Sequence, residues 1–584
     1  MRVDAATGSE VCQWLLCWVP VDRSSYAKIF GFAEFLAALA LLAVLFTISD
    51  VRYKFRTAIV PGHLYRTTFG TMLLVGTQAL ATEVWIAQGW YVPHVAGLTS
   101  TTWQAMFGLI FLGTFGTWMY FAYIRPPIFD RRNAERYANT LFVMLVKAND
   151  EELKVLASEV GRSAQSIISN AGEAAAASRR IGSAPNSKHI PKHQGYAVDL
   201  LYLIASRSFC RHIVASSPVT IIQFLDAASQ SNTKRVPIGE FAQSVSIEAF
   251  ANKNSFVFYE DRHYDSGLIG HLKPVTQALY GRYSLIEAME KEGVSSFNLP
   301  FDAQQQWDGT QWEAYCRLAL LFFEDYVKAT SARSRSQALR EVLRNVSLAH
   351  AFGEYEGEQY HRLMEFRRLS ASVNFVKRAI ALLDEHGAPP DQPRPKKSYT
   401  RESIYDDLAH LMFDACKHVA RVKRKDFASW AIQYGCVWSE FFSFDDTATW
   451  RIVRRRFCHL VAEEVCHVAT RAHFGNVALL GFCANVMGLN MEKRGSATSY
   501  HDTRGLHRLV LRLIREHYPR LLAESTRLAD ALLVGKLSFD PRSRTIVKTY
   551  EMGLSDVAPT ESLAIGGSDT RRTVRRLRSK DVDR

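Results

Sequence analysis

The chain has 584 residues, a formal net charge of +13 and a hydrophobic content of 48%. A chain of this length holds more than one domain, and its long apolar runs are confined to residues 29–124. The basic residues are spread out and show no nucleic-acid-binding signature. We therefore attribute the charge to segments near an anionic membrane and expect no specific nucleic-acid partner.

Three apolar stretches predict membrane helices, because a hydrocarbon core is crossed by about 20 apolar residues. They cover approximately residues 29–48, 67–86 and 103–124, and together they predict a three-helix transmembrane anchor over residues 29–124. Residues 1–28 lack the basic start of a signal peptide. We expect them to form an outer-facing, interfacial segment.

The basic residues in the loops predict the orientation of this anchor. Four Lys or Arg residues follow the first helix and four follow the third, whereas the loop at residues 87–102 has none. Cytoplasmic loops carry the excess of Lys and Arg. The N-terminus is therefore expected outside and the large C-terminal body in the cytoplasm.

Two carboxylates, Glu34 and Glu83, lie inside the predicted membrane helices at similar depth. Intramembrane carboxylates are costly and often mark an ion or proton path. The alternative is that each reaches the headgroups, or stays protonated beside Thr82 and Gln78. Both interpretations remain open at this point.

The nine cysteines include no C-x-x-C pair. Seven lie in apolar, helix-like stretches of the body and are predicted to be buried free thiols of a reducing compartment. Cys12 and Cys17 would meet oxidising conditions if the N-terminus is outside, and whether they are bridged stays open.

The body is predicted to be mainly helical from the 3.6-residue period of its apolar residues. We expect a helical domain at residues 125–385, a Pro-rich linker at 386–400, and a second helical domain at 401–553 that ends in a β-hairpin. Within the first domain, residues 171–196 are predicted to be a linker and 255–259 a short strand. Residues 554–584 are predicted to be a basic, disordered tail.

Candidate metal ligands occur at helical spacing. His459, Glu463 and His467 are successive i, i+4 positions, and Glu464 with His467 forms a Glu-x-x-His pair. Similar pairs are Glu358/His361 and Glu260/His263. Di-iron carboxylate bundles use two such pairs on different helices. A chain with 18 His produces such pairs by chance, so we assign no metal site, no catalytic residue and no cofactor.

The run Arg-Pro-Pro-Ile-Phe at residues 125–129 closes the third apolar stretch, and the run Phe-Cys-Arg-His-Ile-Val-Ala-Ser-Ser-Pro occupies residues 209–218. With the overall layout, these two runs resemble a group of uncharacterised bacterial inner-membrane proteins. The resemblance implies a bacterial inner membrane as the location and carries no activity.

The chain is thus expected to be mainly α, with a membrane anchor and a large cytoplasmic body. Motifs for nucleotide binding and nucleophilic catalysis are absent from the sequence. Our leading hypothesis is a membrane-tethered scaffold or adaptor that associates with the lipid bilayer and with a cytoplasmic protein partner or itself. Alternatives are a membrane sensor or channel-like effector gated by the body, and a di-iron-like oxidoreductase. No small-molecule substrate is identified.

Overall fold

A computed structural model gives the fold of the chain. It describes residues 11–13, 16–20, 29–48, 50–60, 64–94, 100–182, 191–231, 236–260, 274–332, 335–349, 364–390, 403–422, 427–442, 447–491, 498–550 and 560–566. The described chain is mainly helical, as predicted, with two small sheets. Most of the predicted linker at 386–400 and part of the predicted tail, 567–584, lie outside the described residues.

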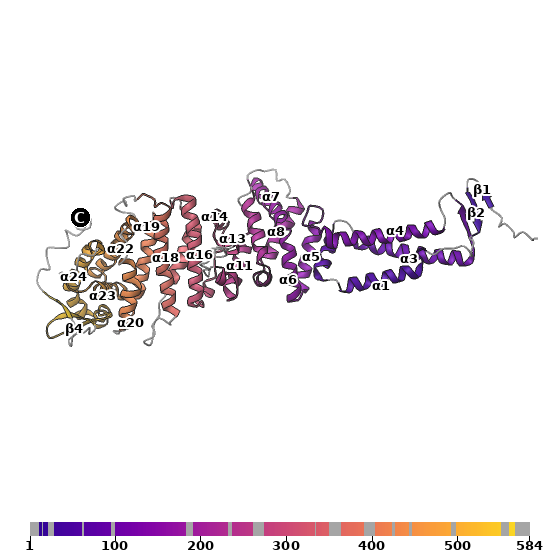
Figure 1. Ribbon diagram of the computed structural model, residues 1–584. Helices are drawn as coiled ribbons and strands as arrows, with labels where there is room; N and C mark the ends of the chain where they lie inside the picture. Colours follow the sequence, from indigo (N-terminus) through magenta and orange to yellow (C-terminus); the bar gives the residue numbers. More distant parts are fainter. Residues whose placement is uncertain are drawn as a thin grey trace, which may run out of the picture. The chain divides into compact units, whose positions relative to one another are not determined.

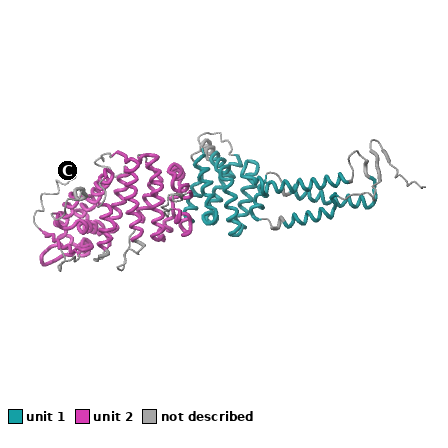
Figure 2. The backbone as a smooth tube through the Cα atoms, in the orientation of Figure 1, with its two compact units in different colours: residues 1–248 teal, residues 249–584 magenta. Residues whose placement is uncertain are grey.

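The chain divides into two compact units, residues 1–248 and 249–584 (Figure 2). The sequence placed a domain boundary at the Pro-rich linker. Helices α18 (Met364–His386) and α19 (Ile404–Val419), which flank that linker, instead pack against each other inside the second unit.

Three apolar helices of the first unit lie side by side (Figure 1): α1 (Phe32–Ile48), α3 (Leu64–Gln88) and α4 (Ser100–Met119), which continues as the π-helix η1 (Tyr120–Ile124). Their shared core contains Phe35, Val75 and Phe107. A Cβ atom on Gly76 would lie 2.6 Å from the Phe35 ring, so glycine at this position lets α1 approach α3.

Two helical segments are long and apolar enough to cross a membrane, residues 66–88 and 101–124. The third span predicted from the sequence does not reach this length. Helix α1 has 17 residues, or about 25 Å at 1.5 Å per residue, against a hydrocarbon core of about 30 Å. It is short because it starts at Phe32 rather than Ile29, and a new helix, α2 (Val51–Ala58), begins soon after Ile48.

A small antiparallel sheet joins the N-terminal segment to the connection between α3 and α4. Strand β1 (Val11–Gln13) pairs with β2 (Leu16–Pro20), and β2 pairs with β3 (Tyr91–His94). Residues Cys12 and Cys17 are Cα partners in the register of β1 and β2. The segment predicted to be interfacial therefore contains two strands.

The rest of the first unit is a layered set of helices. Asn149 and Glu152 form a capping box at the start of α6, and Pro218 occupies the first turn of α10. The predicted linker at 171–196 is wrong in its first half, because α7 continues to Gly182 through an alanine run of high helix propensity. The helices are α5 (Ala134–Lys147), α6 (Asp150–Gly161), α7 (Ala164–Gly182), α8 (Lys192–Ile204), α9 (Arg207–Ser216), α10 (Pro218–Gln230) and α11 (Gly239–Ala251), which crosses into the second unit.

The first half of the second unit is built around α16 (Gly309–Thr330), which packs along α18 and buries large aromatic side chains such as Trp312 and Tyr315. The strand predicted at 255–259 is wrong: these residues form the short helix α12, whose apolar side chains are buried. The remaining helices of this half are α12 (Phe256–Tyr259), α13 (Pro274–Tyr280), α14 (Tyr283–Lys291), α15 (Phe301–Gln305) and α17 (Gln337–Leu348).

The second half packs α19 against α22 and surrounds α23, which is buried from Asn476 to Met487. Its helices are α20 (Phe427–Trp430), the π-helix η3 (Ala431–Trp438), α21 (Ser439–Phe442), α22 (Ala448–Cys466), the 3₁₀ turn η4 (His467–Ala469), α23 (Phe474–Met487), α24 (Thr498–Glu524) and α25 (Thr526–Leu532).

The predicted hairpin is confirmed by β4 (Leu537–Asp540) and β5 (Thr545–Thr549), which pair antiparallel. A third strand, β6 (Thr560–Ala564), pairs with β5 and lies in the segment predicted to be a disordered tail. The prediction missed it because five residues with one buried leucine give little periodic signal.

Candidate functional site

The two carboxylates singled out in the sequence, Glu34 and Glu83, are brought together at the N-terminus of α1. The backbone N–H of Gly31 donates to Glu34 Oε2 at 2.9 Å, and that of Phe32 donates to Glu83 Oε1 at 3.0 Å. The first N–H groups of a helix have no partner within the helix and carry partial positive charge. Both carboxylates therefore act as acceptors that cap α1, one from its own first turn and one from α3.

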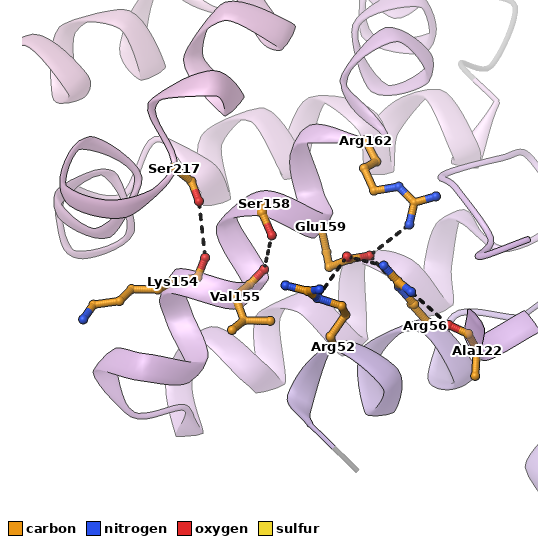
Figure 3. Close-up of polar contacts among 9 residues, drawn as sticks. All are labelled: Arg52, Arg56, Ala122, Lys154, Val155, Ser158, Glu159, Arg162 and Ser217. Atoms are coloured by element: carbon orange, nitrogen blue, oxygen red, sulfur yellow. Dashed lines mark hydrogen bonds and ion pairs between the residues drawn. The ribbon is translucent and has the colours of Figure 1, made fainter. Parts of the chain in front are cut away.

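A second charged cluster lies where α2 meets α6, and we call it the junction cluster: Arg52, Arg56, Glu159 and Arg162. Glu159 of α6 is 7% exposed. Arg56 of α2 binds it through two parallel bonds, Nε to Oε2 at 2.8 Å and Nη2 to Oε1 at 2.6 Å (Figure 3). Paired bonds of this kind are stronger than a single contact and fix the relative orientation of the two groups.

Arg56 also reaches the last apolar helix. Its Nη1 donates to the carbonyl oxygen of Ala122 in η1 at 2.9 Å (Figure 3). The π-helical turn changes the hydrogen-bond pattern at the end of this helix. The Arg56 side chain, 12% exposed, thereby connects α2, α6 and η1.

Two further arginines approach the same carboxylate at longer range. Arg52 Nε lies 3.5 Å from Glu159 Oε1, and Arg162 Nη1 lies 3.4 Å from Oε2. Their side chains are 40% and 39% exposed. Three guanidinium groups thus share one carboxylate, and the cluster has an excess of two positive charges.

Apolar packing holds the same elements together beside the charges. The ring of Tyr137 in α5 is fully buried and meets Phe55 of α2 at 5.3 Å and Phe129 at 5.6 Å between ring centroids, both edge-to-face. Burial raises the pKa of Tyr137 well above its usual value, so the phenol stays neutral. Asn133 Nδ2 donates to the carbonyl oxygen of Ile59, which ties the start of α5 to the end of α2.

The sequence did not identify the junction cluster as a site. Arg52 and Arg56 were used only to predict orientation, and Glu159 stands 103 residues from Arg56 with no local motif around it. The available signal was a basic loop next to a predicted membrane helix. Nothing in one sequence indicates which carboxylate such a loop will bind.

The candidate metal ligands do not converge. Glu464 has Lys417 at 3.6 Å, His473 at 3.8 Å and His467 at 3.9 Å, which is an ion-pair arrangement that does not include His459. Within the residues that the structure describes, no group of three or more His, Cys, Asp or Glu side chains is arranged to hold a metal ion.

Of the other two Glu-x-x-His pairs, only Glu260 lies within the described residues. The Glu260 carboxylate accepts the backbone N–H of Thr276 at 2.8 Å, so it caps the start of α13. Its partner His263, and the pair Glu358/His361, lie outside the described residues.

The described cysteines of the body are free thiols, of which Cys210, Cys316, Cys416 and Cys483 are buried. Burial raises the pKa of Cys316 and of the half-buried Cys436 to about 12. A thiol nucleophile acts as the thiolate. At neutral pH these two groups are protonated and serve as packing atoms.

A small cavity of about 150 Å³ lies in the second unit between α16 and α18, with Arg317, Glu324 and Arg378 in its lining. Sites for small molecules generally measure about 300–1,000 Å³. This cavity therefore gives no case for an organic substrate.

No protein-family model matches the chain, and no curated protein or solved structure matches it.

Proposed function

We propose that the protein is a membrane-tethered helical scaffold in which the first helices of the body are fixed to the anchor. The junction cluster carries this proposal. A flexible linker is sufficient to keep a body near a membrane, whereas here a buried Arg56–Glu159 pair and a buried aromatic cluster hold α2, α5 and α6 together. Such a junction holds these first helices of the body in one orientation relative to the anchor.

The anchor of this proposal includes α1 as a third, short span. Apolar side chains on α1, α3 and α4 point outward, and several are largely exposed, among them Leu41 at 74%, Leu73 at 71% and Leu109 at 68%. An exposed apolar surface of this extent is unfavourable in water and is expected in contact with lipid. A span shorter than the bilayer is accommodated by local thinning or by flanking residues.

The proposed orientation places the N-terminus outside and the body in the cytoplasm. The Lys and Arg residues after α1 and after α4 support it. The pairing of β2 with β3 also supports it, because the N-terminal segment and the α3–α4 connection must then lie on the same side. We place the protein in a bacterial inner membrane on the resemblance of residues 125–129 and 209–218.

Mass spectrometry of proteins that co-purify with the tagged full-length chain from gently solubilised native membranes tests the scaffold. We expect a stoichiometric cytoplasmic partner that is lost when residues 197–584 are removed. A homo-oligomer with no other protein attached would contradict recruitment.

A second candidate is a membrane effector, and the convergence of Glu34 and Glu83 on α1 favours it. In this case the two carboxylates would line an ion path in an oligomer of the anchor. The test is ion flux in reconstituted vesicles with Glu34→Gln and Glu83→Gln together. Ion flux that disappears in the double variant supports the membrane effector. Absence of flux in the unaltered protein excludes this function.

A further inference from the structure

The junction cluster holds more positive charge than its own carboxylate neutralises. Arg56 occupies both oxygens of Glu159 with short bonds, so Arg52 and Arg162 make only longer contacts with that carboxylate. Among the described residues, neither of these two arginines has an ion pair with any other acid. Each guanidinium carries five donors, and about two fifths of each side chain faces solvent.

The position of the cluster limits which chemical group can reach its arginines. Helix α2, which carries Arg52, begins three residues after the end of α1, and Arg56 reaches the carbonyl of Ala122 near the end of the span at 101–124. If these helices cross the membrane, as the proposed function requires, Arg52 lies at the height of the inner headgroups. A phosphodiester is the group that meets a guanidinium there.

We propose that Arg52 and Arg162, whose side chains are about two fifths exposed, bind the phosphate of an anionic phospholipid. Glu159 and Arg56 fix the cluster from its buried side, so the two outer arginines are held in place before the lipid arrives (Figure 3). The lipid supplies the negative charge that the cluster lacks. The inference rests on the proposed membrane anchor and adds a ligand to the junction.

The first unit provides a matched control in a second cluster of arginines around one buried carboxylate. Glu248 is 3% exposed and accepts from Arg207 Nε at 3.0 Å and Arg211 Nε at 3.1 Å. Here each arginine has its own carboxylate oxygen, and the side chains are 61% and 67% exposed. These residues belong to α9 and α11, which follow the apolar helices by more than 80 residues.

The experiment measures retention of phosphatidylglycerol by the purified full-length protein in mild detergent, by native mass spectrometry. Phosphatidylcholine and inorganic phosphate are titrated in parallel. The variants are Arg52→Gln with Arg162→Gln, and Arg207→Gln with Arg211→Gln as the control. Glutamine removes the charge and keeps a polar, hydrogen-bonding side chain, and the thermal unfolding midpoint without lipid shows whether each variant is folded.

We expect the first double variant to lower the affinity for phosphatidylglycerol roughly thirtyfold, and the control to leave it within about twofold. Arg52→Lys with Arg162→Lys should recover part of the loss. Equal losses in both pairs would overturn the proposal, because they indicate a general charge effect. Displacement of the lipid by inorganic phosphate would overturn the lipid as ligand.

Failure of the anchor itself is recognised separately, by washing native membranes with alkaline carbonate. A protein that stays in the washed membranes but does not retain phosphatidylglycerol contradicts only the lipid site. A protein that the wash removes contradicts the membrane anchor and the lipid site together.

Discussion

Replacing Glu159 by glutamine removes the charge that organises the junction cluster. Glu159 is 7% exposed and Arg56 is 12% exposed, so Arg56 would keep its charge in a site with little water. Removing one partner of a buried ion pair costs about 3–5 kcal/mol. Glutamine still accepts one hydrogen bond, which places Glu159→Gln at the lower end, about 3 kcal/mol.

Hydrogen–deuterium exchange of the full-length protein in lipid nanodiscs measures this cost locally. About 3 kcal/mol corresponds to roughly a hundredfold higher population of the open junction. Backbone amides of α2 and α6 should exchange faster by up to that factor, while those of α16 in the second unit should not change.

Glu248→Gln is the control for a buried carboxylate with arginine partners. Arg207 and Arg211 are 61% and 67% exposed, so water replaces the lost contact and the cost should be about 1 kcal/mol. If exchange in α2 of Glu159→Gln stays within about threefold of the unaltered protein, this ion pair does not hold the junction together.

Three further predictions concern packing and pH. Gly76→Ala should weaken the contact of α3 with Phe35 by about 1–3 kcal/mol, since the new Cβ lies 2.6 Å from that ring. The loss of stability is measured as a lower thermal midpoint in detergent. Gly481→Ala should lower the stability of the second unit by about 3 kcal/mol or more, because its Cβ would lie 2.0 Å from the backbone oxygen of Leu532. Burial and nearby cations lower the pKa of His418 below 6.5. Below pH 6.5 the unfolded chain therefore binds more protons than the folded one. The free energy of unfolding should fall as the pH falls through that value.

Each of these predictions has a control in the same chain. A Cβ on Gly113 or on Gly435 meets no atom within 4 Å, so Gly113→Ala and Gly435→Ala should leave the corresponding midpoints unchanged or raise them slightly through the higher helix propensity of alanine. If the control substitutions lower the midpoints as much as Gly76→Ala and Gly481→Ala do, the loss does not arise from the close contacts, because helix propensity favours alanine over glycine. For the pH effect, His418→Gln should flatten the fall in stability below pH 6.5, and an unchanged slope would assign it to other groups.

Helical content and the apolar spans were accessible from the sequence because each depends on a local pattern. Apolar residues at 3.6-residue spacing predict helices wherever they persist over three or more turns. The errors occurred where the local pattern is short or ambiguous. The alanine run before Gly182 has the composition of a linker and the propensity of a helix, and helix α7 forms there.

The junction could not be predicted in the same way. Arg56 and Glu159 are 103 residues apart, and their pairing depends on how α2, α5 and α6 pack. The similar depth of Glu34 and Glu83 was inferred from residue counts along two helices, whereas their shared role as caps of α1 depends on where α1 begins. Helix ends are set by local hydrogen bonds, which sequence periodicity does not contain.

A distance measurement tests most directly whether the anchor and the first helices of the body form one rigid piece. Spin labels are attached to noncanonical amino acids that replace Leu73 in α3 and Glu151 in α6. These side chains are 71% and 81% exposed, so the labels leave the packing undisturbed. Double electron–electron resonance in nanodiscs should give one narrow distribution of distances between the two labels, which broadens in Glu159→Gln. A broad distribution in the unaltered protein would contradict a rigidly mounted scaffold.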